Sequence, residues 1–89
     1  MHDDDLKSAE RFNATLGAVI RAEATFQGKS MAQLSRETGI EYMTLGRYLR
    51  GQRDIPVTVL YRCALHLATT VEALVRQTMV KMGYITGDK

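Results

Sequence analysis

Residues 29–51 decide the fold of this chain, and they read KSMAQLSRETGIEYMTLGRYLRG. Ser30 and Gln33 have the spacing of a capping box, in which the serine side chain binds the backbone at Gln33 and the glutamine reaches back. Gly39 can end the helix that starts there, because glycine accepts the left-handed conformation. A second helix is expected over residues 42–50. The stretch therefore predicts two short helices joined by a tight turn, and helices of this length need tertiary packing to persist.

Helical patterns on both sides of this stretch predict three further helices. Their ranges are residues 8–26, 56–68 and 69–82. Gly28 is a plausible stop for the first of them, and Pro56 suits the first turn of the next. Thr69 and Glu72 have capping-box spacing at the start of the last. The residues expected to face the core are Phe12, Leu16, Val19, Ile20, Leu34, Ile40, Leu45, Tyr48, Val57, Leu60, Tyr61, Ala64 and Leu67. The predicted fold is all-α with five helices.

The length of 89 residues indicates one small domain. We expect an acidic flexible tail over residues 1–7, the domain over residues 8–83, and a loose C-terminal tail over residues 84–89. One cysteine, Cys63, allows no intramolecular disulfide, which suits a reducing cytoplasm. No apolar run is long enough to span a bilayer, and the start MHDDD is unlike a signal peptide. These features favour a cytoplasmic protein with no membrane partner.

Charge and reactive residues narrow the function further. The formal net charge is +2, but five basic and two acidic residues fall within positions 29–53, so the basic excess lies on the two short helices. His2 and His66 have no metal-ligand partners at useful spacing, and Cys63 is expected to be a core residue. No catalytic pair or triad is present in the sequence. The chain is therefore not expected to be an enzyme or to bind a metal, a cofactor or a small-molecule ligand.

Residues 16–75 resemble the Cro/lambda-repressor-like helix-turn-helix family, also called the XRE family. The positions that carry the resemblance are Leu16, Gly17, Ile20, Arg21, Leu34, Ser35, Gly39, Ile40, Leu45, Arg47, Tyr48, Ala64, Leu67, Leu74 and the run from Arg50 to Arg53. The resemblance implies a five-helix lambda-repressor-like domain that binds double-stranded DNA. Met31, Leu49 and residues 41–43 depart from the family's usual pattern, and Pro56 is displaced by one position. A base preference therefore does not transfer.

In such a domain the second short helix lies in the major groove, and side chains near its N-terminus meet base edges. The residues predicted to contact bases are Glu41, Tyr42, Met43, Gly46 and Arg47. Those predicted to contact the DNA backbone are Lys29, Ser30, Gln33, Arg50 and Arg53. Arg47 suits a bidentate contact with guanine or a phosphate. Three alternatives remain open: Gly46 is merely tolerated, Arg50 pairs with Asp54, and Gln33 serves only the capping box.

A single copy of this domain reads about half a DNA site, so a homodimer is expected. The predicted dimer surface is an apolar stripe near the C-terminus made by Val75, Met79, Met82, Tyr84 and Ile85. The alternative is a monomer in which the last helix packs back on the first.

Two functions fit these observations. The first is a Cro-type transcriptional repressor, of phage or prophage origin, that occupies a palindromic operator. The second is an antitoxin-like module that neutralises a partner protein and regulates its own operon. Salt-sensitive duplex binding would favour the first, and a co-purifying neighbour would favour the second.

Overall fold

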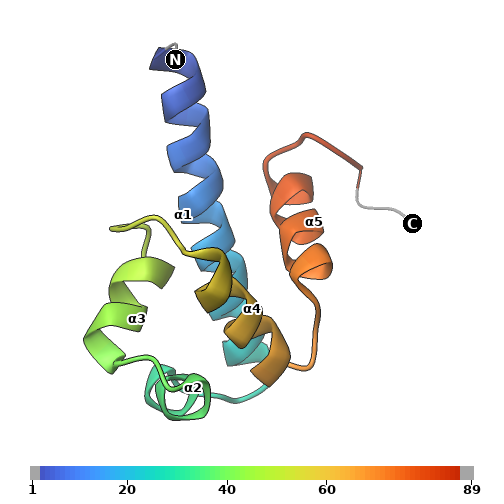
Figure 1. The fold of residues 1–89 in the computed structure, drawn as a ribbon. Coiled ribbons are helices and arrows are strands. Elements are labelled where there is room, and N and C mark those ends of the chain that lie inside the picture. The colour runs from blue at the N-terminus through green and yellow to red at the C-terminus, as the bar shows by residue number, and fades with distance from the viewer. Residues whose placement is uncertain (1–2, 87–89) are drawn as a thin grey trace.

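The computed structural model describes residues 3–86, and within them the chain forms five α-helices and no strand (Figure 1). The helices are α1 (Asp3–Phe26), α2 (Met31–Thr38), α3 (Tyr42–Leu49), α4 (Val57–His66) and α5 (Val71–Lys81). The predicted all-α, five-helix architecture is confirmed. Figure 1 shows α1 as a long column, with α2 and α3 at its lower end and α5 beside its upper half. No helix in the described residues is long and apolar enough to cross a membrane.

The start of α1 corrects the prediction that residues 1–7 form a flexible tail. The helix begins at Asp3 rather than at Ser8, and residues 1 and 2 lie outside the described part of the chain. Asp4 and Asp5 lie in the first turn, where negative charge interacts favourably with the helix dipole. Ser8 also contacts the C-terminal segment, since its hydroxyl lies 2.9 Å from the Tyr84 hydroxyl. These contacts extend the folded domain toward the N-terminus.

One core joins all five helices. Its fully or nearly buried members are Leu16, Val19, Ile20, Ala24, Leu34, Ile40, Leu45, Leu49, Val59, Leu60, Cys63, Ala64, Leu67 and Leu74. Burying one leucine side chain stabilises a fold by roughly 1.5–3 kcal/mol, so these contacts supply the packing that the short helices need. Phe12 and Tyr48, expected inside, are only partly buried at the edge of the core.

The buried face of α4 differs from the predicted stripe. Val57 and Tyr61 are 70% and 59% exposed, whereas Val59 and Cys63 are buried. The polar residues from 57 to 67 are Thr58, Arg62 and His66, which share one stripe, so periodicity leaves open which of the flanking apolar faces is buried. Packing against α2 and α5 selects the buried face.

The predicted start of α4 and the predicted ends of α5 also differ slightly from the structure. Pro56 precedes α4 as its N-cap residue instead of lying in the first turn. The N-cap of α5 is Thr70 rather than Thr69, and its side chain accepts a hydrogen bond from the Ala73 N–H at 3.0 Å. After α5, the Tyr84 N–H donates to the Met79 carbonyl at 2.9 Å. Tyr84 is therefore tied to the domain, while residues 87–89 of the predicted tail lie outside the described residues.

α1 crosses α3 at a point where the two backbones almost touch. A Cβ atom placed on Gly17 would overlap the Leu49 carbonyl group, with the carbonyl carbon only 2.8 Å away. One turn further along α1, the Arg21 Nε donates a 2.9 Å hydrogen bond to the same carbonyl oxygen. Leu49 was not expected inside, yet its side chain is fully buried, one turn after Leu45. This crossing fixes the C-terminal end of α3 on the domain.

Asn13 holds the linker between α3 and α4, a role that no local sequence pattern indicates. Its side-chain NH₂ donates to the Arg53 carbonyl at 2.9 Å, and its side-chain oxygen accepts from the Ile55 N–H at 2.9 Å. Next to it, the Cβ of Ala14 lies 3.1 Å from the position that a Cβ on Gly51 would occupy. The linker therefore follows a defined path along α1.

The crossing at Gly17 leads to a stability prediction. In an open helix, Gly→Ala stabilises by about 1 kcal/mol through helix propensity. Gly17→Ala should instead destabilise the fold by about 1–3 kcal/mol, because the added methyl group meets backbone atoms that cannot move aside. Urea unfolding measures the difference in free energy.

Gly46→Ala is the matched control, because Gly46 also lies inside a helix. A Cβ there would meet the Arg50 guanidinium at 2.9 Å, which is the mobile end of a long side chain. This variant should keep or gain stability. Equal effects at both positions would contradict the role assigned to the crossing.

Candidate nucleic-acid interface

A network of short polar contacts sets the angle between α2 and α3. The Thr38 hydroxyl donates to the Leu34 carbonyl at 2.8 Å and accepts from the Ile40 N–H at 3.3 Å. The Ser35 hydroxyl donates to the Ile40 carbonyl at 2.5 Å. Gly39 ends α2 with φ of 76°, a left-handed conformation that glycine adopts without strain. The turn that presents α3 is therefore closely constrained.

Glu41 is the N-cap of α3. Its carboxylate accepts hydrogen bonds from the Thr44 hydroxyl at 2.8 Å, the Thr44 N–H at 2.9 Å and the Met43 N–H at 3.1 Å. The Thr44 hydroxyl and then these two N–H groups lower the pKa of Glu41 below its ordinary value. The expectation that Glu41 faces a DNA base therefore needs correction, because its carboxylate is already engaged in starting the helix.

The outer face of α3 presents three side chains to solvent. Tyr42 and Met43 are each 52% exposed, and Arg47 is exposed one turn after Met43. Arg47 forms no ion pair among the described residues. Two apolar or aromatic side chains and one free guanidinium thus lie on the surface expected to enter the groove.

Gly46 does not belong to this open face. It is buried, and the Arg50 guanidinium folds back over it. A side chain therefore covers Gly46 in this arrangement, and the predicted approach of the helix backbone to the groove floor would require Arg50 to move away. The glycine instead leaves room for Arg50. Arg50 forms no ion pair with Asp54 among the described residues, so that alternative is not what the structure shows.

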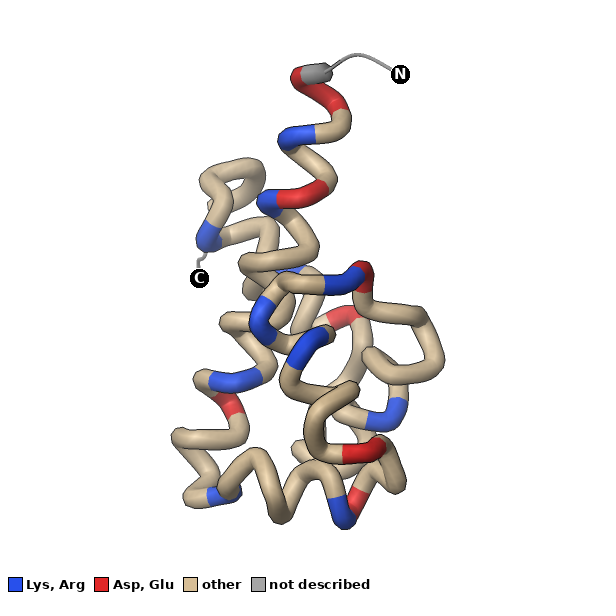
Figure 2. The backbone as a smooth tube through the Cα atoms, turned by 90° about the vertical axis from the view of Figure 1, so that its left-hand side faces the viewer, with Lys and Arg blue, Asp and Glu red and all other residues tan. Residues whose placement is uncertain are grey.

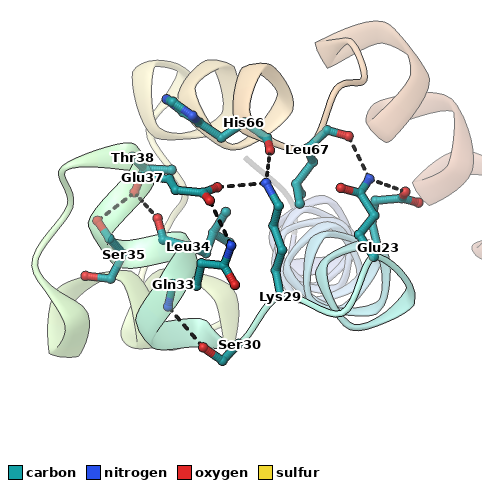
Figure 3. Close-up of polar contacts among 11 residues, drawn as sticks. Glu23, Lys29, Ser30, Gln33, Leu34, Ser35, Glu37, Thr38, His66 and Leu67 are labelled. Atoms are coloured by element: carbon teal, nitrogen blue, oxygen red, sulfur yellow. Dashed lines mark hydrogen bonds and ion pairs between the residues drawn. The ribbon is translucent and has the colours of Figure 1, made fainter.

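The N-terminus of α2 keeps only half of the expected capping box. The Ser30 hydroxyl accepts from the Gln33 N–H at 3.1 Å, as predicted. The Gln33 side chain does not return to Ser30, because its NH₂ donates to Glu37 at 2.9 Å (Figure 3). Ser30 remains exposed beside the free N–H groups of this helix end.

Lys29 has a structural role instead of the expected contact with the DNA backbone. Its ammonium group lies 2.7 Å from the Glu37 carboxylate and 2.6 Å from the His66 carbonyl, as Figure 3 shows. Lys29 therefore ties the α1–α2 connection to the C-terminal end of α4. The hydrogen bond from Lys29 is the largest cause that lowers the pKa of Glu37. A neighbouring hydrogen bond from Gln27 to the Leu67 carbonyl, at 2.7 Å, strengthens the same junction.

Arg53 lies exposed in the linker that follows α3. Its guanidinium carbon is 5.8 Å from the centre of the Tyr48 ring, which is a cation–π distance. Figure 2 views the molecule from the side of α3, and lysine and arginine segments recur on this side, both around α3 and on the N-terminal half of α1. The basic residues therefore extend beyond the two short helices.

The predicted dimer surface is partly used within the chain. Val75 packs against the core, Met79 and Met82 are half-buried, and the Tyr84 hydroxyl contacts Ser8. Ile85 remains 38% exposed.

A more exposed apolar stripe lies on α4. Val57, Tyr61 and Leu65 are 70%, 59% and 57% exposed, and their spacing places them on one face of the helix.

Cys63 is a core residue, as predicted. Cys63 is fully buried, and burial raises the pKa of its thiol to about 11, which disfavours the thiolate. Within residues 3–86, no group of histidine, cysteine and carboxylate side chains is arranged to hold a metal ion. His2 lies outside the described residues.

Comparison with known proteins assigns a family to most of this region. A family model described as helix-turn-helix matches residues 27–74, which is 48 of the 89 residues and includes α2, the turn, α3 and α4. No curated protein and no solved structure matches the chain.

The cap at Glu41 predicts a pH-dependent stability. A carboxyl group whose pKa is lower in the folded state stabilises the fold above its unfolded pKa, near 4.5, and this stabilisation is lost as the pH falls through the folded pKa. Glu41→Gln should therefore unfold at lower urea than the wild type at pH 7. The difference should shrink as the pH is lowered through that range.

Thr44→Val tests the cause, because it removes the hydroxyl that donates to Glu41. Thr44→Val should therefore lose part of the pH-dependent stability that Glu41→Gln loses. A pH profile of Glu41→Gln parallel to that of the wild type would show that the carboxylate does not cap α3.

Proposed function

The chain belongs to the Cro/lambda-repressor-like (XRE) helix-turn-helix family of DNA-binding transcription regulators, and we propose that it is a sequence-specific repressor of the Cro type. It would bind a short, palindromic operator in double-stranded DNA and block transcription by occupying that site. The observation that carries this proposal is the exposed strip of Tyr42, Met43 and Arg47 on a helix that its cap, its turn and its crossing with α1 hold in place. A fixed helix with free side chains along its outer face suits the major groove.

Each side chain of the strip has a distinct part in the proposed complex. Arg47 donates to guanine through its fork of N–H groups, which match the two acceptors of that base. Tyr42 and Met43 contact thymine methyl groups, and the Tyr42 hydroxyl alternatively reaches a phosphate. Glu41 acts by positioning α3, because its carboxylate already accepts three hydrogen bonds.

The backbone contacts are proposed to flank this strip on two sides. On one side, Ser30 and the free N–H groups at the start of α2 meet a phosphate, assisted by the dipole of that helix. Gln33 lies beside them, with its amide shared with Glu37. On the other side, Arg53 and Arg50 follow α3, and Arg50 leaves Gly46 to do so.

We also propose that two copies bind together. A palindromic operator presents two half-sites roughly 34 Å apart, and a pair of domains matches that symmetry. The α4 stripe supports this proposal, because Val57, Tyr61 and Leu65 form an exposed apolar face. A second copy of the chain is the occupant assigned to this face. Met79, Met82 and Ile85 form a second candidate contact near the C-terminus.

Arg47 and Arg53 should give different binding defects. Arg47→Ala should cost about 1–3 kcal/mol on the preferred sequence and relax the preference at one position, because it removes a base contact. Arg53→Ala should weaken binding to all sequences alike, because it removes a phosphate contact. Gel-shift titrations against a duplex selected from random DNA, and against an unrelated duplex, measure both effects. Unchanged affinity in both variants would refute the proposed surface.

The oligomeric state should depend on α4. The wild type should sediment as a dimer, and Tyr61→Arg should shift it to monomer, because it places a charge in the apolar stripe. Ile85→Arg is the comparison at the C-terminal surface. Dissociation by Ile85→Arg alone would move the interface to α5 and the following residues. A wild-type monomer both free and on operator DNA would contradict the dimer.

A further inference from the structure

A second surface with basic residues lies between the N-terminal half of α1 and the linker that joins α3 to α4. Lys7 and Arg11 of α1 and Arg53 of the linker line one open depression, together with the carboxylates of Glu10 and Asp54. The family match begins at residue 27, so the two α1 cations lie outside it. The family match therefore assigns no role to Lys7 and Arg11.

Helix geometry places these cations in a row. Lys7 and Arg11 are four residues apart, and Ala14 follows three residues later on the same face of α1. Ala14 contacts Gly51, immediately after α3 and its cap residue. Counted back along α1 from Ala14, Arg11 therefore lies about one turn and Lys7 about two turns from the end of α3.

The linker side of the depression is fixed by contacts already described. Asn13 binds the Arg53 carbonyl and the Ile55 N–H, each at 2.9 Å, so the linker cannot shift freely along α1. The Arg53 guanidinium lies over the Tyr48 ring of α3. Arg53 therefore connects the outer surface of α3 with the basic row on α1.

The three cations make no ion pair with the side chains that the structure describes. Among residues 4–86, whose side chains are described, the ion pair within 4.0 Å joins Lys29 to Glu37 and involves none of Lys7, Arg11 and Arg53. Figure 2 shows the basic segments of α1 and those around α3 on the same side of the molecule. A charged strand that passes the C-terminal end of α3 would meet Arg53 first and the α1 row next.

We propose that Lys7 and Arg11, continuing from Arg53, bind the phosphate backbone of the DNA that flanks the site read by α3. This inference rests on the proposed function, since it needs α3 in the groove. Lys7 and Arg11 are separated by about 6 Å along the helix axis. Successive phosphates of one strand are 3.4 Å apart along the duplex axis, so the distance between Lys7 and Arg11 corresponds to about two phosphate spacings. The long α1 thereby adds a contact that reads no bases and extends the footprint.

The first test is the salt dependence of Lys7→Ala/Arg11→Ala in the full chain. Each phosphate contact contributes about 0.9 to the slope of log affinity against log salt. The double variant should therefore show a slope shallower by about 1.8, with equal weakening on a selected duplex and an unrelated duplex. Its thermal unfolding should match the wild type, because both side chains are exposed.

Arg76→Ala/Lys81→Ala is the matched control. It removes the same charge from exposed positions that line a separate depression on α5. Its slope should stay near that of the wild type. Equal slopes for the two double variants would overturn the inference, because they would show a general charge effect instead of a contact.

The second test uses the length of the duplex. Wild-type affinity should fall when base pairs beyond the selected site are removed, whereas the Lys7/Arg11 double variant should be insensitive to that truncation. Equal sensitivity in both proteins would overturn the inference.

The third test is a gain of affinity. Glu10→Gln removes a carboxylate from the same depression, so it should tighten binding to the long duplex more than to the short one. Since this variant is expected to strengthen binding, damage to the fold cannot imitate the result. An unchanged or weaker affinity would count against the flanking contact.

These outcomes separate the two proposals. If the wild type binds no duplex from the random selection, the proposed function fails and the inference fails with it. If the wild type binds and Arg47→Ala weakens binding, but the Lys7/Arg11 variant behaves like its α5 control, only the flanking contact fails.

Discussion

The near-contact between Gly17 and the Leu49 carbonyl is the constraint on which the rest of this structure depends. α3 has eight residues and cannot persist alone in water. The missing side chain at Gly17 lets α1 approach the end of α3 at backbone distance, and Arg21 binds the carbonyl that the approach exposes. Leu45 and Leu49 are then driven fully into the core. A short helix thus gains the rigidity that reading a DNA groove requires.

The C-terminal ends of α2 and α4 are held as the end of α3 is, by side chains from other elements that bind their last carbonyl groups. The last carbonyl groups of a helix have no partner within that helix. Gln27 and Lys29 bind the Leu67 and His66 carbonyls at the end of α4, and Arg62 lies 3.4 Å from the Thr38 carbonyl at the end of α2. Side chains from neighbouring elements therefore join the short helices into one unit. Several polar residues that look free in the sequence serve this internal purpose.

This use of polar side chains reshapes the binding surface. Glu41 and Lys29 are engaged within the fold, and Arg50 covers Gly46. What remains open is a compact strip at Tyr42, Met43 and Arg47, with Ser30 on one side and Arg53 on the other. The α1 cations continue that surface past the linker. In the proposed complex, base reading and backbone binding would fall to separate elements that one long helix connects.

The sequence by itself determined the five-helix, helix-turn-helix architecture, because caps, glycine stops and apolar spacing act over a few residues. It placed Ser30, Gly39 and the exposed position of Arg47 correctly. Only the tertiary structure decided which apolar face of α4 is buried, since apolar residues flank its single polar stripe on both sides. Only the tertiary structure likewise showed that Lys29 reaches the His66 carbonyl and that Asn13 binds the linker, because these partners lie 37 to 42 residues away along the chain. A local pattern carries no record of contacts that form when distant segments meet.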